Sequence, residues 1–192
     1  ARLGWSHGDD EIFSREQFLQ WFDLDHLGSS AGRFDEAKLR WVNAQHLKAM
    51  DDALLAPLVA EQLARRGVVA DERLPALCAL YKDRCDTTVA LADWVTPHFA
   101  DVVPAQTDLA QHITEAVRPA LATLAQKLAD CSWDKQTISV AIKETITAHG
   151  LKMPQLAMPV RVLVMGTAQT PSLDAVLALH HRDIVIERLR RA

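Results

Sequence analysis

Apolar positions along the chain recur mostly at intervals of three and four, the spacing of one face of an α-helix. Two helices are predicted before residue 50. The first begins at Ser14, because the Ser14 hydroxyl and the Gln17 side chain can form a capping box, and it ends before Gly28. The second follows Asp35 as its N-cap. Its inward face would comprise Leu39, Val42, His46, Leu47 and Met50.

The same period continues through the middle of the chain. A third helix would bury Leu55, Val59 and Leu63 and stop at Gly67, and a fourth would have Pro75 in its first turn. We expect Asp86 to cap the next helix, with inward residues that include Val89, and Pro97 to end it. Pro104 and the short extended stretch before it, residues 101–103, break the period and predict a boundary.

Helical patterns resume after this boundary, and one segment is ambiguous. Residues 160–165 are apolar and β-branched, which favours a strand, but no partner strand is predicted anywhere in the chain. We therefore expect a short helix that begins at Pro159 and ends at Gly166. Pro119 would begin one helix, Asp134 would cap another, and the last two would open at Thr170–Pro171 and Asp183. The predicted fold class is all-α.

Composition narrows the class of protein. Of 192 residues, 49% are apolar and 24% charged, which is typical of a folded protein and excludes collagen-like, low-complexity and mostly disordered chains. No apolar run approaches the length of a membrane span, and no signal peptide precedes the first helix. Three scattered cysteines favour a reducing compartment, so we expect a cytoplasmic protein. Because the chain opens on Ala1 without a Met, we expect it to be part of a longer protein.

Charge is unevenly distributed along the chain. The net charge is −4, but residues 1–64 carry 6 basic and 11 acidic side chains, whereas residues 131–192 carry 8 and 5. A basic C-terminal third is weak evidence for an anionic partner.

A search for catalytic chemistry finds little. The chain has no phosphate-binding loop, no zinc-protease helix and no nucleophile elbow, and its paired acids stand at helix starts, where they complement the helix dipole. His180 and His181 are adjacent, so on a helix they would diverge rather than share a metal ion. Cys78 and Cys85 are best interpreted as buried thiols, and the five Trp as packing residues. We predict no catalytic, cofactor-binding or metal-binding residue.

Several motifs resemble the bacterial-type glutamyl-tRNA synthetases, a family of class I aminoacyl-tRNA synthetases. Residues 3–14 read LGWSHGDDEIFS, and FD at 34–35 is followed by KL at 38–39 and WVN at 41–43. Further on are RCDT at 84–87, PVR at 159–161, TPSL at 170–173 and RDIVIERL at 182–189. The resemblance covers essentially the whole chain.

The resemblance implies an all-helical cage of the anticodon-binding type with two small helical subdomains. Residues 1–48 would be the end of the stem-contact region, residues 49–104 the first anticodon-binding subdomain and residues 105–192 the second. The family's H-I-G-H and K-M-S-K-S signatures are absent from the chain. The isolated chain is therefore not expected to be an enzyme, whereas the parent would join glutamate to tRNA(Glu) with ATP and Mg²⁺. The implied partners are tRNA(Glu) and the parent's own N-terminal catalytic domain, with no membrane, and the implied state is a monomer.

Mapped residue by residue, the family's anticodon readers fall on Arg84, Arg161, Thr170, Pro171 and Leu173. Arg84 would recognise the third anticodon base, a cytosine, through its O2 and N3 acceptors, because anticodon bases are unstacked and splayed out. Arg161 and the Thr170–Leu173 turn would hold the first base. His180–His181 replaces a Leu-Gly turn that is common in relatives, so the last turn departs from the family pattern.

The sequence also allows purely structural roles for these residues. Arg84 could be a solvated charge on a helix, Arg161 could pair with a neighbouring helix, and Pro171 and Leu173 could simply fix a helix entry. The whole chain could instead be a helical adaptor that docks a protein partner and has no role with RNA.

Overall fold

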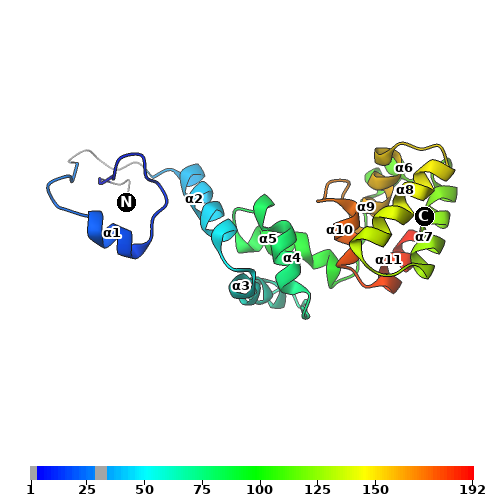
Figure 1. Cartoon of the computed structure of the whole chain (residues 1–192), viewed down its shortest axis with the longest axis horizontal. Helices are drawn as coiled ribbons and strands as arrows, with labels where there is room; N and C mark the ends of the chain where they lie inside the picture. Colours follow the sequence, from blue (N-terminus) through cyan, green and yellow to red (C-terminus); the bar gives the residue numbers. More distant parts are fainter. Residues whose placement is uncertain (1–3, 29–33) are drawn as a thin grey trace.

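The computed structural model describes residues 4–28 and 34–192, and in these ranges it contains helices and no β-strand. Figure 1 shows an elongated molecule with α1 at one end and α6–α11 at the other. The helices are α1 (Arg15–Trp21), α2 (Glu36–Ala49), α3 (Asp52–Ala64), α4 (Leu74–Tyr81), η1 (Lys82–Arg84), α5 (Thr88–Val95), η2 (Thr96–His98), α6 (Gln106–His112), α7 (Arg118–Asp130), α8 (Lys135–Ala148), α9 (Met153–Met165), α10 (Leu173–Ala178) and α11 (Arg182–Leu189). The all-α prediction is confirmed. No helix in the described part of the chain is both long and apolar enough to cross a membrane.

The N-terminal region, residues 4–50, has little interior of its own. Trp5 is buried against the rings of Phe13, Phe18 and Phe22, whose centroids lie 5.3–6.1 Å away. No residue of α1 is buried, and in α2 only Leu47 is. The capping box at Ser14 and the cap at Asp35 form as predicted. The predicted inward face of α2 is wrong at Leu39 and His46, which are exposed, because no other helix covers that side.

Helices α3, α4 and α5 pack on one another and, with η1 after α4 and η2 and the residues up to Ala100 after α5, form the first helical unit. Leu63, Leu77 and Tyr81 are completely buried among them, and for Leu63 this burial was predicted. The predicted Asp86 cap is wrong: the N-cap of α5 is Thr87, whose hydroxyl accepts from the Ala90 amide. Asp86 instead forms an ion pair with Arg40 of α2. Val89, which was predicted to face inward, is 48% exposed.

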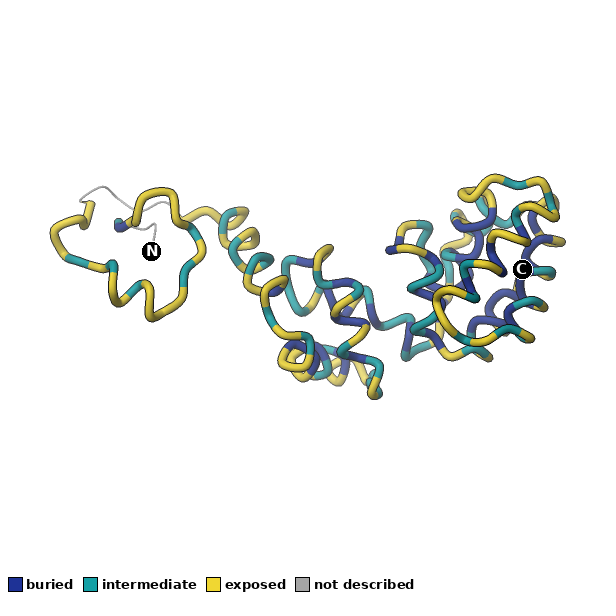
Figure 2. The backbone as a smooth tube through the Cα atoms, viewed as in Figure 1, coloured by how far each residue is buried: buried dark blue, intermediate teal, exposed yellow. Residues whose placement is uncertain are grey.

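Helices α6–α11 form the second helical unit around α9, which contacts α6, α7, α8 and α11. Figure 2 shows dark, buried segments concentrated in this unit and in the first helical unit. Residues 160–165 are helical, as predicted, because α9 is covered on nearly all sides and therefore carries apolar residues all round. The predicted entry is wrong: α9 begins at Met153, and Pro159 lies inside it rather than at its start.

The end of α9 depends on glycine. Gly166 has φ +72°, in the left-handed region, and its amide donates to the Val162 carbonyl. A Cβ there would lie 2.9 Å from Val102 Cγ1, closer than packed carbon atoms approach. Gly166 therefore both ends the helix and lets it contact the extended segment, residues 101–104, that joins the two helical units.

Candidate functional site

Arg84 is the last residue of η1 and is held between two buried residues. Tyr81 on one side is inaccessible, and Cys85 on the other is 4% exposed. The Cys85 amide donates to the Lys82 carbonyl and closes the turn. Backbone and neighbours are thus fixed while the Arg84 side chain itself is exposed to solvent.

A tether from α2 reinforces the segment that follows Arg84. The Arg40 guanidinium lies 3.2 Å from the Asp86 carboxylate, and the Asn43 amide donates to the Asp86 carbonyl. Lys82, two residues before Arg84, binds the Asp52 carboxylate and the Met50 carbonyl, each at 2.8 Å. The Asp86 carboxylate, two residues after Arg84, is therefore paired with Arg40.

Arg161 lies on α9 and is half-buried. Its Nη2 donates to the Pro171 carbonyl at 3.3 Å, whereas its buried Nε has no hydrogen-bond partner. Burial and, to a smaller extent, the positive charge of Arg84 lower the pKa of Arg161 below its usual value. Arg84 and Arg161 are far apart in sequence, yet the charge of Arg84 contributes to lowering the pKa of Arg161.

Neither member of this arginine pair has an acidic partner among residues 4–28 and 34–192. Two neighbouring guanidiniums without a carboxylate form a site that is incomplete without an anion or a set of hydrogen-bond acceptors. The alternative in which Arg161 pairs with an acid of a neighbouring helix therefore has no support in the described structure.

The turn before α10 carries the other three predicted residues, and all three are buried. Thr170 is 8% exposed, and its hydroxyl donates to the Pro171 carbonyl at 3.0 Å. Leu173 is 5% exposed and is the first residue of α10, while Ser172 rather than Thr170 occupies the N-cap. Because Arg161 and Thr170 share the Pro171 carbonyl, the turn positions the Arg161 guanidinium.

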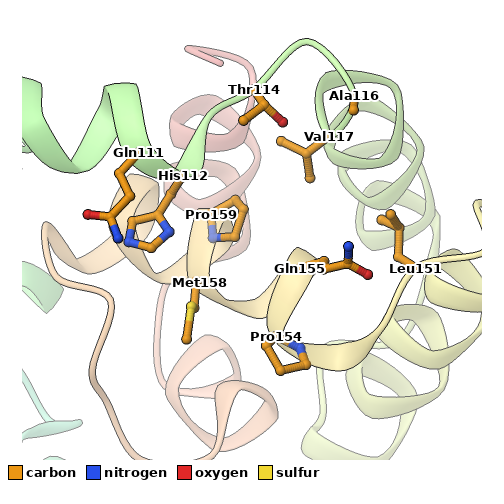
Figure 3. Close-up of a pocket in the computed structure, with 10 residues that line it drawn as sticks. All are labelled: Gln111, His112, Thr114, Ala116, Val117, Leu151, Pro154, Gln155, Met158 and Pro159. Carbon is orange, nitrogen blue, oxygen red and sulfur yellow. The ribbon is translucent and has the colours of Figure 1, made fainter.

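The arginine pair does not line either of two pockets that occur elsewhere in the structure. One, of about 330 Å³, lies between the end of α6 and the start of α9, with His112, Met158 and Pro159 among its lining residues (Figure 3). The other, of about 420 Å³, lies between α7 and α11, beside Arg182 and Arg190. Because Arg84 is exposed and Arg161 half-buried, the candidate site is accessible from the surface, where a macromolecule can reach it.

Of the cysteines and histidines that the sequence singled out, Cys78, Cys85 and His180 lie in the interior. Burial raises the pKa of the Cys78 thiol to about 12 and that of Cys85 to about 11. The ring of His180 is buried and stacks on His98 at 3.8 Å, whereas His181 is exposed. No group of three or more metal-ligating side chains occurs in the described part of the chain.

Two arginines that bind backbone carbonyls were missed by sequence reasoning: Arg188, which is buried, and Arg73, which is partly exposed. Arg188 is 3% exposed and binds three backbone carbonyls, and Arg73 binds two more. A signal existed for Arg188, because it lies three residues after the buried Val185 and hence on the inward face of α11.

The profile of a family described as "Anticodon binding domain" matches residues 44–192. Glutamate–tRNA ligase of Albidiferax ferrireducens is 67% identical over 99% of this chain, and that of Paracidovorax citrulli is 64% identical over 100%. The chain spans 41% of the length of each of these relatives. A solved glutamate tRNA ligase from Elizabethkingia meningosepticum superposes with a TM-score of 0.90 at 22% identity, over 98% of this chain and 38% of that one, which shows a shared fold.

Proposed function

Because the chain belongs to the anticodon binding domain family, we propose that it reads the anticodon loop of tRNA(Glu) for a glutamate–tRNA ligase. The observation that carries the proposal is the arginine pair: Arg84 is exposed, Arg161 is half-buried with a buried Nε that has no partner, and no salt bridge joins either of them to an acid in the described residues. RNA supplies what they lack, namely phosphate charge and base-edge acceptors.

Arg84 is the better placed of the two to recognise a base. The buried residues Tyr81 and Cys85 fix the backbone of Arg84, while its side chain is exposed. The backbone therefore needs little ordering before the Arg84 guanidinium can donate hydrogen bonds to an unstacked base. Cytosine offers O2 and N3 as adjacent acceptors, and a purine at the same place does not. We propose that Arg84 selects cytosine as the third anticodon base.

Arg161 and the Thr170–Leu173 turn would serve the first anticodon base. The Arg161 guanidinium is held by the Pro171 carbonyl and retains further N–H donors, since a guanidinium has five. Thr170, Pro171 and Leu173 would act mainly by fixing this guanidinium, because they are themselves buried.

The remaining expectations for the whole protein follow from the curated relatives. We propose that the parent is an ATP- and Mg²⁺-dependent ligase that works as a monomer in the cytoplasm, and that this chain adjoins its catalytic domain. Residues 1–48 would complete the stem-contact region, with subdomains at 49–104 and 105–192. ATP chemistry would belong to the part of the relatives that this chain does not span, because its residues include no phosphate-binding loop.

The decisive experiment is an NMR titration of the 192-residue chain with a tRNA(Glu) anticodon stem-loop. We expect the amide signals around Arg84, Arg161 and Thr170 to shift, and binding to weaken steeply as salt is added. Saturable binding of a protein partner that is insensitive to salt, with no response to RNA, would support an adaptor instead.

A matched pair of variants tests the role of Arg84. Arg84→Gln should reduce the preference for cytosine over guanine at the third position by roughly 5- to 150-fold, the contribution of a good bidentate base contact. Arg65→Gln removes the same charge from an exposed residue that is paired with Glu61, and it should leave the preference intact. Equal loss in both variants would reduce Arg84 to a general electrostatic role.

A further inference from the structure

The two helical units meet at a junction built around two arginines, Arg73 and Arg188. Arg188 of α11 donates to the carbonyls of Pro97 and Ala100, at 2.9 and 2.7 Å, which belong to the end of the first helical unit. It also donates to the Val164 carbonyl, at 2.6 Å, in the last turn of α9. One guanidinium therefore joins three segments of the chain.

Arg73 crosses the same junction from the other side. It stands at the start of α4, where the Asp71 carboxylate orients its guanidinium through several hydrogen bonds of 2.7–3.0 Å. From there it donates to the Leu179 carbonyl at 2.8 Å and to the His98 carbonyl at 3.3 Å. Leu179 is the residue that ends α10.

These contacts reach the elements that carry the candidate site. Val164, an acceptor of Arg188, lies on α9, and Arg161 lies one turn earlier on the same helix. Leu179, an acceptor of Arg73, ends α10, which begins at Leu173 directly after the turn that holds Arg161. Arg73 directly precedes α4, and η1, which ends at Arg84, directly follows it. The junction thus links α9 and α10, which position Arg161, to α4, which leads into the turn that carries Arg84.

The chemistry of the junction is one that only arginine supplies. Each acceptor is a backbone carbonyl, so the bonds form with any sequence at those positions and depend on the backbone being in place. A planar guanidinium directs several N–H groups along fixed directions, whereas a lysine ammonium is a point donor that cannot span the three carbonyls at once. The ring stack of His98 on His180 packs beside these bonds.

Resting on the proposed function, we infer that Arg73 and Arg188 are positioning residues for anticodon recognition. They touch no RNA themselves. They fix the separation of Arg84 and Arg161, and therefore the pair of anticodon positions that can be read at the same time.

The chain contains a matched control in Arg182. Its guanidinium also binds backbone carbonyls, those of Ala129 and Cys131 at 3.5 and 2.7 Å, and it lies over the Trp133 ring. Both acceptors lie in the second helical unit, so this arginine joins α11 to α7 without crossing the junction. Arg182→Lys removes the same kind of contact and leaves the separation of the units alone.

The first measurement is base preference, as the ratio of dissociation constants for stem-loops with cytosine or guanine at the third anticodon position. In Arg188→Lys and Arg73→Lys we expect the preference to fall by about fivefold, the lower end of what a well-placed base contact contributes. Combining either change with Arg84→Gln should cost little further preference, because both act through Arg84. Arg182→Lys should keep the wild-type preference. Unchanged preference in both junction variants would overturn the inference.

The second measurement needs no RNA and separates the two proposals. Spin labels on Leu54→Cys of α3 and Val140→Cys of α8, both exposed sites, report the distance between the units. Cys131→Ser removes the partly exposed native thiol, while Cys78 and Cys85 are buried. We expect a narrow distance distribution in the parent and in Arg182→Lys, and a broader one in the junction variants. An unchanged distribution there would overturn the inference even where base preference had changed.

The outcome for the wild-type chain tells the two failures apart. Absence of any base preference in the wild type defeats the proposed function, and the inference falls with it. A wild-type preference that survives in both junction variants defeats the inference alone. If Arg188→Lys does not fold by circular dichroism, Arg73→Lys carries the test.

Discussion

The arginine pair and the junction use the same side chain in opposite ways. At the junction, Arg188 is buried and donates hydrogen bonds to three backbone carbonyls. In the pair, Arg84 is exposed, and Arg161 keeps one bond and a buried Nε without a partner. A guanidinium that makes several hydrogen bonds to the protein holds the structure together, although the buried Nε of Arg188 also lacks a partner, whereas a guanidinium that makes few such bonds is available to a ligand.

The largest expected effect is on the junction side of this comparison. Arg188→Met should lower the free energy of unfolding by about 3 kcal/mol, because three carbonyls lose a charged donor and methionine offers none. Urea unfolding followed by circular dichroism measures it. Arg84→Met should change stability by less than about 0.5 kcal/mol, as for an exposed side chain without contacts. Equal destabilisation by Arg188→Met and Arg84→Met would contradict the distinction between a structural Arg188 and an Arg84 that is available to a ligand.

The junction should also respond to acid. Burial lowers the pKa of His98 to about 3 and that of His180 well below its usual value. Between pH 6.5 and the folded-state values, the unfolded chain binds more protons, so stability falls as the pH falls through this window and is level above it. The expected slope is on the order of 1 kcal/mol per pH unit for each histidine.

Unfolding free energies measured at pH 7, 6 and 5 test this slope. His180→Leu should reduce it by about one histidine's share, and substitution of the exposed His181 by Leu should leave it unchanged. If the unfolding free energy depends on pH equally in the wild type and in both variants, the acid sensitivity arises from groups other than His180.

A smaller effect of opposite sign is expected in the pair. Arg161→Met should leave stability unchanged or raise it by up to about 1 kcal/mol, because a half-buried charge with an unsatisfied Nε and a like-charged neighbour is replaced by an apolar side chain. Affinity for the anticodon stem-loop should fall at the same time. Thermal unfolding and RNA titration of the same sample measure both, and a clear loss of stability would give Arg161 a structural role as well.

The smallest effect concerns the tether beside Arg84. Arg40→Gln should cost less than about 0.5 kcal/mol of stability, since both partners of the ion pair with Asp86 are partly exposed. If the tether helps to hold η1, base preference should fall slightly more than in the control Arg65→Gln. Indistinguishable preferences would mean that Tyr81 and Cys85 alone fix Arg84.

Local features of the fold were predictable from the sequence, and features that depend on neighbours were not. The caps at Ser14, Asp35 and Asp134 form because they need only a few consecutive residues. The exposed Leu39 and His46 have the spacing of a buried face, but whether such a face is covered depends on other helices. The N-cap of α5 is Thr87 rather than the predicted Asp86, because the Asp86 side chain pairs with Arg40 of α2.

The candidate site divides in the same way. Arg84 and Arg161 were named from motifs, but their proximity could not be, because it arises from the packing of α9 against elements of the first helical unit. The burial of Thr170, Pro171 and Leu173 was likewise invisible in the motif, which records identity and not exposure. Arg73 and Arg188 were missed because their partners are backbone carbonyls, which leave no trace in sequence.

Gly166 limits how this part of the chain can vary. A left-handed φ and a 2.9 Å approach to Val102 exclude larger residues for two independent reasons. Trimming Val102 to Ala would create room for a methyl group but would leave the backbone penalty of about 1 kcal/mol. Sequence drift at this position therefore cannot be rescued by a change at its neighbour, and an exchange of the two helical units between homologous proteins should keep residues 101–104 and the end of α9 together as one inherited block.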